Sequence, residues 1–130
     1  MYVIYFKSSL IRNILVEMNE SIVEPFLQFY YSQLNDKRFE QIIPHLKEHS
    51  IFSREQLNLK GTENIIHSLN MMNGHFEPKK VTYLMSGDRR ANIVVSGIFN
   101  HQYIFCEFLH LAYGNDKSYW IQSSILQMVH

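Results

Sequence analysis

The second half of the chain restricts the fold most, because its hydrophobic pattern there is that of β-strands. Four β-rich runs follow one another: Val81 to Ser86, Ala91 to Phe99, Tyr103 to Tyr113 and Ser118 to Val129. The turn-forming segments between them are only a few residues long, namely Gly87-Asp88, Asn100-His101 and Gly114-Asn115-Asp116. Connections this short join neighbouring antiparallel strands, so the sequence predicts an antiparallel sheet built from consecutive hairpins.

The first half of the chain has the three- and four-residue spacing that is typical of amphipathic helices. Within residues 19–36 the apolar positions on one helical face are Ile22, Val23, Phe26, Leu27, Tyr30, Tyr31 and Leu34. We expect this helix to begin near Ser21 or Ile22. Pro25 then falls in the first turn, where a missing N–H costs little.

Two further helices and two short strands complete the predicted elements. A second, shorter helix is predicted over residues 39–46, with a kink at Pro44. Short strands are predicted at 50–53 and 56–60, and a third helix at Thr62, its candidate cap. The fold class is therefore α+β, with three N-terminal helices packed on a strongly curved, mostly antiparallel sheet.

The chain divides into an N-terminal extension, residues 1–17, and one domain, residues 18–130. The extension has Lys7 and Arg12 but no acid before Glu17, a composition loosely like that of an organelle presequence. Its other interpretations are a short extra strand or helix, or a segment upstream of a true start at Met18. The sequence leaves its role open.

Composition excludes several classes of function. Twelve Lys and Arg residues balance twelve Asp and Glu residues, so the net charge is zero at pH 7. A neutral chain lacks the basic surface that binds phosphates, and we expect no direct contact with nucleic acid or membrane. Cys106 is the single cysteine, which excludes an internal disulfide and a multi-cysteine metal site.

The predicted strand from Tyr103 to Tyr113 is apolar on both faces. One face carries Tyr103, Phe105, Glu107, Leu109 and Leu111, and the other carries Ile104, Cys106, Phe108, His110 and Ala112. Such a strand must be covered twice, once by its own helices and once by a ligand, a second subunit or a partner. A dimer is the simplest cover.

Three segments, in this order, carry a resemblance to a known family. They are Phe26-Leu27-Gln28-Phe29-Tyr30-Tyr31, then Leu57-Asn58-Leu59-Lys60-Gly61-Thr62-Glu63-Asn64-Ile65-Ile66, and last Ser118-Tyr119-Trp120-Ile121-Gln122-Ser123-Ser124. The set resembles the nuclear transport factor 2 family over nearly the whole domain. The resemblance implies a cone, in which three helices wrap on a curved sheet, in agreement with the pattern above.

The resemblance also implies a function, and it leaves alternatives. It implies a small, non-enzymatic, dimeric adaptor of nucleocytoplasmic transport, in the cytoplasm, the nucleus and the nuclear pore, that binds phenylalanine-glycine repeats of nucleoporins. Its cargo would be the GDP form of the GTPase Ran. An alternative is the small subunit of a heterodimer with a messenger-RNA export receptor. A second alternative is a cone-fold enzyme, such as an isomerase or dehydratase, with a carboxylate in its pocket.

Individual residues follow from the same resemblance. Glu55 falls where the transport factor places an acid that pairs with Ran, and Arg54 falls where the family has a tryptophan used for pore repeats. The acidic pair implied at a later turn is replaced by Asn100, His101 and Gln102. Two further sets come from the apolar pattern of the sequence and not from the resemblance. The first is the candidate dimer or sheet face, which consists of Tyr103, Phe105, Glu107, Leu109 and Trp120. A groove for phenylalanine side chains is a hypothesis for Met71, Met72, Phe76, Tyr83 and Met85.

Glu107 is the candidate for chemistry, because an unpaired carboxylate within an apolar strand would be costly. We interpret it as one half of an ion pair at a dimer interface, with Arg54 or Arg89, in preference to a general base served by tyrosines. His110 lies on the opposite face of the strand. Seven histidines include His45 and His49, four residues apart, but no third ligand is implied, and we predict no metal site and no cofactor.

Overall fold

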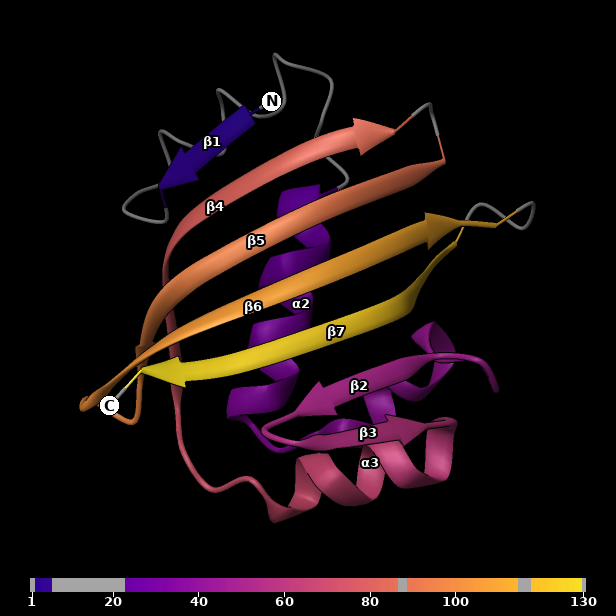
Figure 1. The fold of residues 1–130 in the computed structure, drawn as a ribbon. Helices are drawn as coiled ribbons and strands as arrows, with labels where there is room; N and C mark the ends of the chain where they lie inside the picture. Colours follow the sequence, from indigo (N-terminus) through magenta and orange to yellow (C-terminus); the bar gives the residue numbers. More distant parts are fainter. Residues whose placement is uncertain (1, 6–22, 87–88, 115–117, 130) are drawn as a thin grey trace.

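The computed structural model describes residues 2–5, 23–86, 89–114 and 118–129. Its main element is a curved sheet with the strand order β1-β4-β5-β6-β7-β2-β3 (Figure 1). The strands are β1 (Tyr2–Tyr5), β2 (Ile51–Arg54), β3 (Leu57–Lys60), β4 (Phe76–Ser86), β5 (Arg90–Phe99), β6 (Tyr103–Tyr113) and β7 (Tyr119–Val129). Only β2 and β7 pair in parallel, so the predicted mostly antiparallel sheet is confirmed.

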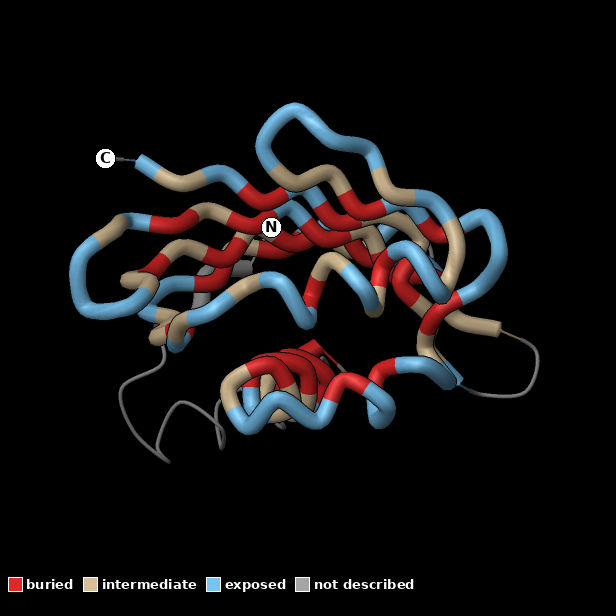
Figure 2. Tube along the Cα trace, turned by 90° about the horizontal axis from the view of Figure 1, so that it is seen from below, coloured by how far each residue is buried: buried red, intermediate tan, exposed pale blue. Residues whose placement is uncertain are grey.

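Helix α2 (Val23–Asn35) crosses the inner face of the sheet. Its buried apolar side chains are Val23, Phe26, Leu27, Tyr30, Tyr31 and Leu34, as the sequence pattern predicts. Figure 2 shows the buried residues gathered between the sheet and this helix. Pro25 lies in the first described turn, where a missing donor breaks no helical hydrogen bond.

The predicted second helix is not a continuous α-helix. Two short 3₁₀ turns stand in its place, η1 (Phe39–Gln41) and η2 (Ile43–His45). Pro44 lies at the start of η2 and lacks the N–H that would continue an α-helical ladder through this segment. Ile42, between the two turns, is still fully buried. The segment therefore supplies core contacts with the helical geometry broken into two pieces.

Helix α3 (Thr62–Met71) begins where predicted, but Thr62 is not its cap. The N-cap position is Gly61, and no side chain caps the helix there. Gly61 has a φ of +88° and a ψ of 156°, a conformation that is open essentially only to glycine. Its N–H donates to the Ser50 carbonyl oxygen, 3.1 Å away, which ties the end of β3 to the start of β2.

Strand β4 is longer than the sequence pattern predicts, because it begins at Phe76 and not at Val81. The additional residues include Glu77, Pro78 and two lysines, a sequence that is not typical of a strand. The register with β5 shifts between Pro78 and Lys80, which marks a β-bulge. A bulge accommodates the proline, and the pairing resumes on both sides of it.

Gly97 on β5 lies opposite this bulge and gives a stability prediction. A Cβ atom there would stand 2.1 Å from the Glu77 carbonyl oxygen and 2.9 Å from the Pro78 Cα atom. Because backbone atoms cannot move aside cheaply, Gly97→Ala should lower the free energy of unfolding by about 2 to 3 kcal/mol. Urea denaturation measures this loss. The matched variant Ser96→Ala, one residue away and half-buried, should lose much less, and equal losses would contradict the clash.

In the described part of the chain, no helix combines the length and apolar character needed to cross a membrane.

Candidate functional site

A buried carboxylate lies at the centre of the inner face. Glu107, in the middle of β6, has no exposed surface. The hydroxyl of Tyr30 donates to its Oε2 and the hydroxyl of Tyr31 donates to its Oε1, each over 2.7 Å. The two tyrosines are adjacent on α2, which lies across this face of the sheet. Helix and sheet are thus joined through one side chain.

Two further donors reach the same carboxylate from β7 and β2, the next two strands of the sheet after β6. The Ser124 hydroxyl donates to Oε2 over 2.5 Å, and Arg54 Nη2 lies 3.3 Å from the same oxygen. Arg54 Nη1 also donates to the Ser124 hydroxyl over 3.0 Å. Leu126 is the register partner of both Arg54 and Glu107, because β7 lies between β2 and β6. The parallel pairing of β2 with β7 therefore brings the arginine to the acid.

The electrostatics keep this cluster in one protonation pattern. Burial raises the pKa of Tyr30 and of Tyr31 well above the usual value of 10.0, and the negative charge of Glu107 adds to the rise. Both tyrosines are therefore protonated donors at neutral pH. With four donors on its two oxygens, Glu107 has the partners that a buried charge requires. Glu107 is not one of the residues that line the two grooves described below.

The predicted ion pair between Glu107 and Arg54 is confirmed, but its predicted location at a dimer interface is wrong. Phe105, Glu107 and Leu109 have 0 to 2% of their surface exposed within the single chain. Side chains covered by their own helix cannot contact a second subunit, so these three are core residues. Alternation in the sequence identifies the two faces of β6 but not the one that receives the helix. His110 is on the opposite face, as predicted.

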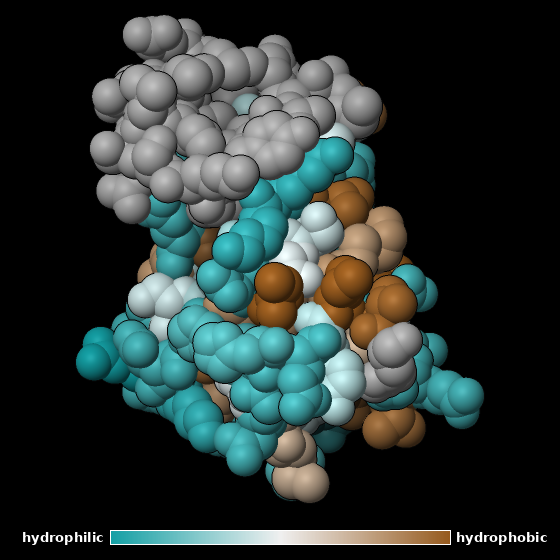
Figure 3. Space-filling view, turned by 90° about the vertical axis from the view of Figure 1, so that its left-hand side faces the viewer, coloured by the Kyte–Doolittle hydropathy of each residue, from teal (hydrophilic) through white to brown (hydrophobic). Residues whose placement is uncertain are grey.

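An apolar groove opens at the end of the molecule where β7 ends. This groove, called the mouth groove here, has a volume of about 300 Å³. It is lined by Arg54, Glu55, Met72, Asn73, Phe99, Tyr103, Leu126 and Met128. Figure 3 looks onto this end of the molecule, where hydrophobic side chains gather beside hydrophilic ones. Of the methionine and aromatic residues proposed for a groove, Met72 lines it, whereas Phe76 and Tyr83 are buried in the core.

The structure brings the two partner-binding candidates, Glu55 and Arg54, to this groove. Arg54 points into the core towards Glu107, while Glu55 is exposed in the turn between β2 and β3. The turn of Asn100 and His101, where the resemblance implies an acidic pair, follows Phe99 and precedes Tyr103, which both line the groove. Both predicted positions of partner charge therefore lie at the rim of one groove.

Glu55 has a φ of +58°, which a non-glycine residue adopts at a cost. Replacing it with glycine relieves that cost, so Glu55→Gly should raise the free energy of unfolding by about 0.5 to 1 kcal/mol. Thermal and urea denaturation measure the change. Gln56→Gly, at the next turn position, has no such positive φ to relieve and should not stabilise the chain. A destabilised Glu55→Gly variant would show that the glutamate side chain makes a stabilising contact.

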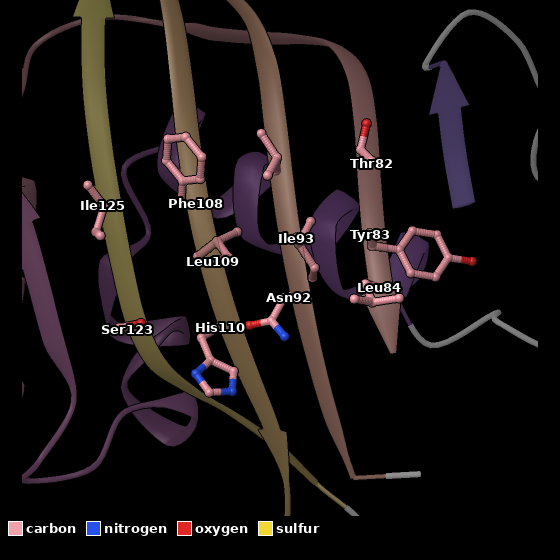
Figure 4. Close-up of a pocket in the computed structure, with 11 residues that line it drawn as sticks. Thr82, Tyr83, Leu84, Asn92, Ile93, Phe108, Leu109, His110, Ser123 and Ile125 are labelled. Atoms are coloured by element: carbon pink, nitrogen blue, oxygen red, sulfur yellow. The ribbon is translucent and has the colours of Figure 1, made fainter. Parts of the chain in front are cut away.

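The outer face of the sheet carries a second groove, called the outer-face groove here, of about 340 Å³. It is lined by Thr82, Tyr83, Leu84, Asn92, Ile93, Val94, Phe108, Leu109, His110, Ser123 and Ile125 (Figure 4). Phe108 is 40% exposed and Ile125 is 43% exposed, on the neighbouring strands β6 and β7. Burial lowers the pKa of His110, and the positive charge of Arg90 lowers it further. The second apolar face that the sequence predicts for β6 is therefore present and uncovered in the single chain.

The remaining candidates lie away from both grooves. Trp120 is half-buried, with the Lys47 ammonium 4.6 Å from its ring centroid and the His49 ring 4.8 Å away. His45 and His49 do not share a helical face, because η2 ends at His45. The Nδ1 atom of His45 lies 2.7 Å from the Tyr119 carbonyl oxygen. Cys106 is half-exposed on the outer face and is not the buried apolar residue that its sequence context suggests.

A curved sheet, a helix across its inner face and a groove at one end define a class of small cone-shaped α+β domains. The model of the nuclear transport factor 2 (NTF2) domain matches residues 22–128. The chain therefore belongs to the nuclear transport factor 2 family. No curated protein sequence matches it at a significant level.

Solved structures share the fold at low sequence identity. Nuclear transport factor 2 from Cryptosporidium parvum is 18% identical, with a TM-score of 0.72 and coverage of 82% of this chain and 90% of that one. A candidate ketosteroid isomerase from Shewanella frigidimarina is 12% identical, with a TM-score of 0.69 over 78% and 90% of the two chains. A candidate scytalone dehydratase from Novosphingobium aromaticivorans is 15% identical, with a TM-score of 0.70 over 92% and 87%. The fold thus occurs in non-enzymes and in candidate enzymes, and these likenesses show the fold alone.

Proposed function

We propose that this chain is a non-enzymatic, dimeric adaptor of nucleocytoplasmic transport. It works in the cytoplasm, the nucleus and the nuclear pore, binds phenylalanine-glycine repeats of nucleoporins and carries Ran in its GDP form into the nucleus. Membership of the nuclear transport factor 2 family supports the class. The similarity of the Cryptosporidium parvum structure supports the cone as its scaffold.

The observation that carries the non-enzymatic part is the state of Glu107. A general base needs a free lone pair that reaches substrate in a cavity. Both oxygens of Glu107 accept from tyrosine hydroxyls, and Oε2 also contacts Ser124 and Arg54. The side chain has about 1% exposure. These contacts favour a structural role and count against the alternative of an isomerase or dehydratase.

The mouth groove fits the partner that this function requires. Its lining is mostly apolar, and Met72 and Met128 are flexible side chains that adapt to an inserted ring. Glu55 places a negative charge at the rim, which favours a basic partner surface around an apolar anchor. A small groove of this kind binds one aromatic side chain at a time, as transient repeat recognition requires.

The outer-face groove supports the dimer. Leu84, Ile104, Phe108 and Ile125 are between 40 and 57% exposed and lie on three strands, β4, β6 and β7, with β5 between β4 and β6. Contiguous exposed apolar side chains on a sheet mark an interaction surface. A second copy presents the same apolar face, so a symmetric pair covers both.

A pH effect follows for this dimer. His110 lies between Asn92 on β5 and Ser123 on β7, with the positive charge of Arg90 nearby, and no described acidic residue lines the outer-face groove. Its pKa is already lowered, and cover by a second copy disfavours the imidazolium further. The dimer is therefore most stable at pH values above the lowered pKa of His110, and its dissociation constant should rise as the pH falls through that pKa. Sedimentation equilibrium from pH 8 to 5 measures this rise. His110→Gln should flatten the profile, and an unchanged profile would contradict the role of His110.

The export-receptor alternative rests on one observation. Asn100, His101 and Gln102 occupy the turn beside the mouth groove, where the resemblance implies two carboxylates for Ran. Without those charges, a partner with fewer basic contacts becomes the better fit. The chain would then be the small subunit of a heterodimer with a messenger-RNA export receptor, joined through the same outer face.

Calorimetric titration of the full chain with Ran in its GDP form tests the proposal. We expect binding that Glu55→Gln weakens about fivefold to tenfold, as loss of a rim charge does, with a smaller salt dependence. Glu48→Gln, another exposed acid located away from the groove, is the control and should bind normally. Nuclear magnetic resonance titration with a phenylalanine-glycine repeat peptide should shift the signals of Met72 and Met128.

The outcomes separate the candidates. Binding of repeat peptides without any binding of Ran at millimolar concentration would favour the export-receptor subunit. Tight capture of an export receptor by the chain would then support that alternative directly. Absence of binding to both the repeats and Ran would overturn the adaptor proposal.

A further inference from the structure

The edge of the sheet carries an element that the family domain does not include. The matched domain spans residues 22–128, whereas β1 is formed by Tyr2–Tyr5. This strand pairs antiparallel with β4, with Tyr2 opposite Tyr83 and Tyr5 opposite Lys80 (Figure 1). Without β1, β4 would be the edge strand, because β5 occupies its other side. The N-terminal tetrapeptide is therefore a ligand of the β4 edge that the chain itself supplies.

The length of the edge that can accept a strand is set by β4 itself. Pro78 has no N–H to donate to a partner strand, and the register shift between Pro78 and Lys80, which lies in the pairing of β4 with β5, bends β4 at this point. The regular part of the edge therefore runs from Lys80 to Ser86. β1 pairs with the first four of these residues, up to Tyr83. In the described chain, β1 leaves the edge from Leu84 to Ser86 without a strand partner, so a longer strand would make more main-chain hydrogen bonds there.

We propose that the β4 edge is a strand-addition site for a protein partner, and that β1 competes with that partner. The partner supplies an extended segment that pairs antiparallel with Lys80 to Ser86. Main-chain hydrogen bonds provide most of the affinity in this mode of recognition, and alternate side chains provide the specificity. The proposal does not depend on the transport function, because strand addition uses the main-chain groups of the β4 edge, although Thr82, Tyr83 and Leu84 also line the outer-face groove.

The residues along the β4 edge indicate which side chains the partner segment should carry. Val81 and Tyr83 are buried on the inner face, so partner residues opposite them must be apolar. In β1 those register positions are held by Ile4 and Tyr2. An antiparallel partner ends beside Lys80, which is exposed next to a second lysine, Lys79. An apolar strand followed by acidic residues therefore fits best, although Glu77 already pairs with Lys79.

Competition by β1 has a measurable consequence. Seventeen residues, 6–22, connect β1 to α2, so occupation of the edge by β1 is an intramolecular equilibrium. The apparent dissociation constant of a competitor is its intrinsic value divided by the fraction of free edge. If β1 occupies the edge about 90% of the time, its removal tightens partner binding about tenfold.

The experiment uses the full chain and a fluorescent hexapeptide, Tyr-Val-Ile-Tyr-Glu-Glu. The variant Val3→Pro with Ile4→Pro removes two neighbouring N–H groups, one of which must face β4, since alternate residues of a strand point their N–H groups to the same side. The described core residues all lie between Val23 and Leu126, so this variant should fold. Val3→Ile with Ile4→Val preserves strand propensity and is the matched control. Fluorescence anisotropy and amide hydrogen exchange are the measurements.

We expect the double proline variant to bind the peptide about tenfold more tightly than the unchanged chain and the control. The peptide should slow amide exchange within residues 80–83, which lie opposite its Tyr-Val-Ile-Tyr segment, and backbone N-methylation of the peptide should abolish binding. Failure of every variant to bind at millimolar concentration would overturn the proposal. Equal binding by all three chains would overturn the competition by β1. Exchange of β1 between copies, seen as a dimer lost only in the proline variant, would replace the partner with a second copy and also overturn it.

Discussion

Glu107→Ala is expected to lower the free energy of unfolding by about 3 to 5 kcal/mol, the usual loss when one partner of a buried ion pair is removed. The change leaves the Arg54 guanidinium, 11% exposed, without its carboxylate. It also leaves the hydroxyls of Tyr30 and Tyr31 without their acceptor inside the core. Urea denaturation followed by circular dichroism measures the loss, and the midpoint of thermal unfolding should fall by more than 10 °C, at roughly 4 °C per kcal/mol.

Further variants separate the contributions of the charges and of the hydroxyl groups to this loss of stability. Arg54→Met combined with Glu107→Leu removes both charges, and because apolar replacements of a buried pair are often nearly neutral, the double variant should recover much of the stability. Tyr31→Phe removes one donor and should cost about 1 kcal/mol. A Glu107→Gln variant that unfolds like the unchanged chain would contradict a charged anchor. Such a result would return Glu107 to the position of a candidate catalytic group.

Local sequence patterns predict most of the sheet. The bounds of β6, Tyr103–Tyr113, are those that the sequence predicts, because apolar runs and turn residues are properties of neighbouring positions. The prediction is incomplete where distant residues decide the structure. The N-terminal half of β4 contains Pro78 and reads as a loop, and only its pairing with β5 across a bulge makes it a strand. The pairing of β1 with β4 is likewise invisible, because it joins segments about 80 residues apart.

The candidate site was predicted in its residue types but not in its geometry. An acid within an apolar strand indicates Glu107, and the sequence offers Arg54 or Arg89 as its counter-charge. Their meeting requires the parallel pairing of β2 with β7, which no local pattern in β2 encodes. Alternation likewise shows that β6 has two apolar faces but not which face α2 covers. Because the covered face is not known from the sequence, Glu107 is predicted at a subunit interface, whereas the structure buries it within the chain.

The mouth groove depends even more than the Glu107 site on residues that are far apart in the sequence. Its lining comes from five segments: the end of β2 with the β2–β3 turn, the residues after α3, the end of β5, the start of β6 and the end of β7. Resemblance to the family indicated Glu55, but the apolar residues around it come from segments without a common motif. Of the methionine and aromatic residues that the sequence suggests for a groove, Met72 is the one that lines it. A groove assembled from five segments is a property of the fold, so the sequence indicates its charged rim and Met72 but not the groove itself.

Phe108→Asp should convert the proposed dimer into monomers, with a dissociation constant raised about 100-fold or more, equivalent to about 2.7 kcal/mol. In a symmetric interface each substitution occurs twice, so two carboxylates lose their hydration on an apolar surface. Phe108 is central in the outer-face groove, between Ile125 on β7 and Val94 on β5 (Figure 4). Sedimentation equilibrium of the purified chain measures the constant at pH 7.5, where His110 is neutral.

The control for this prediction must carry the same charge on a different surface. Leu57 is 65% exposed on β3, at the opposite edge of the sheet from β4, so Leu57→Asp should leave the dimer intact. Phe108 is already 40% exposed in the single chain, so its replacement should leave the monomer folded by circular dichroism. If both variants stay dimeric, the subunits meet elsewhere, because an apolar interface does not bury two unpaired carboxylates without loss of affinity. If the unchanged chain is itself monomeric at high concentration, the homodimer is rejected, and the outer face is then left open for a different protein, as the proposed export-receptor heterodimer requires.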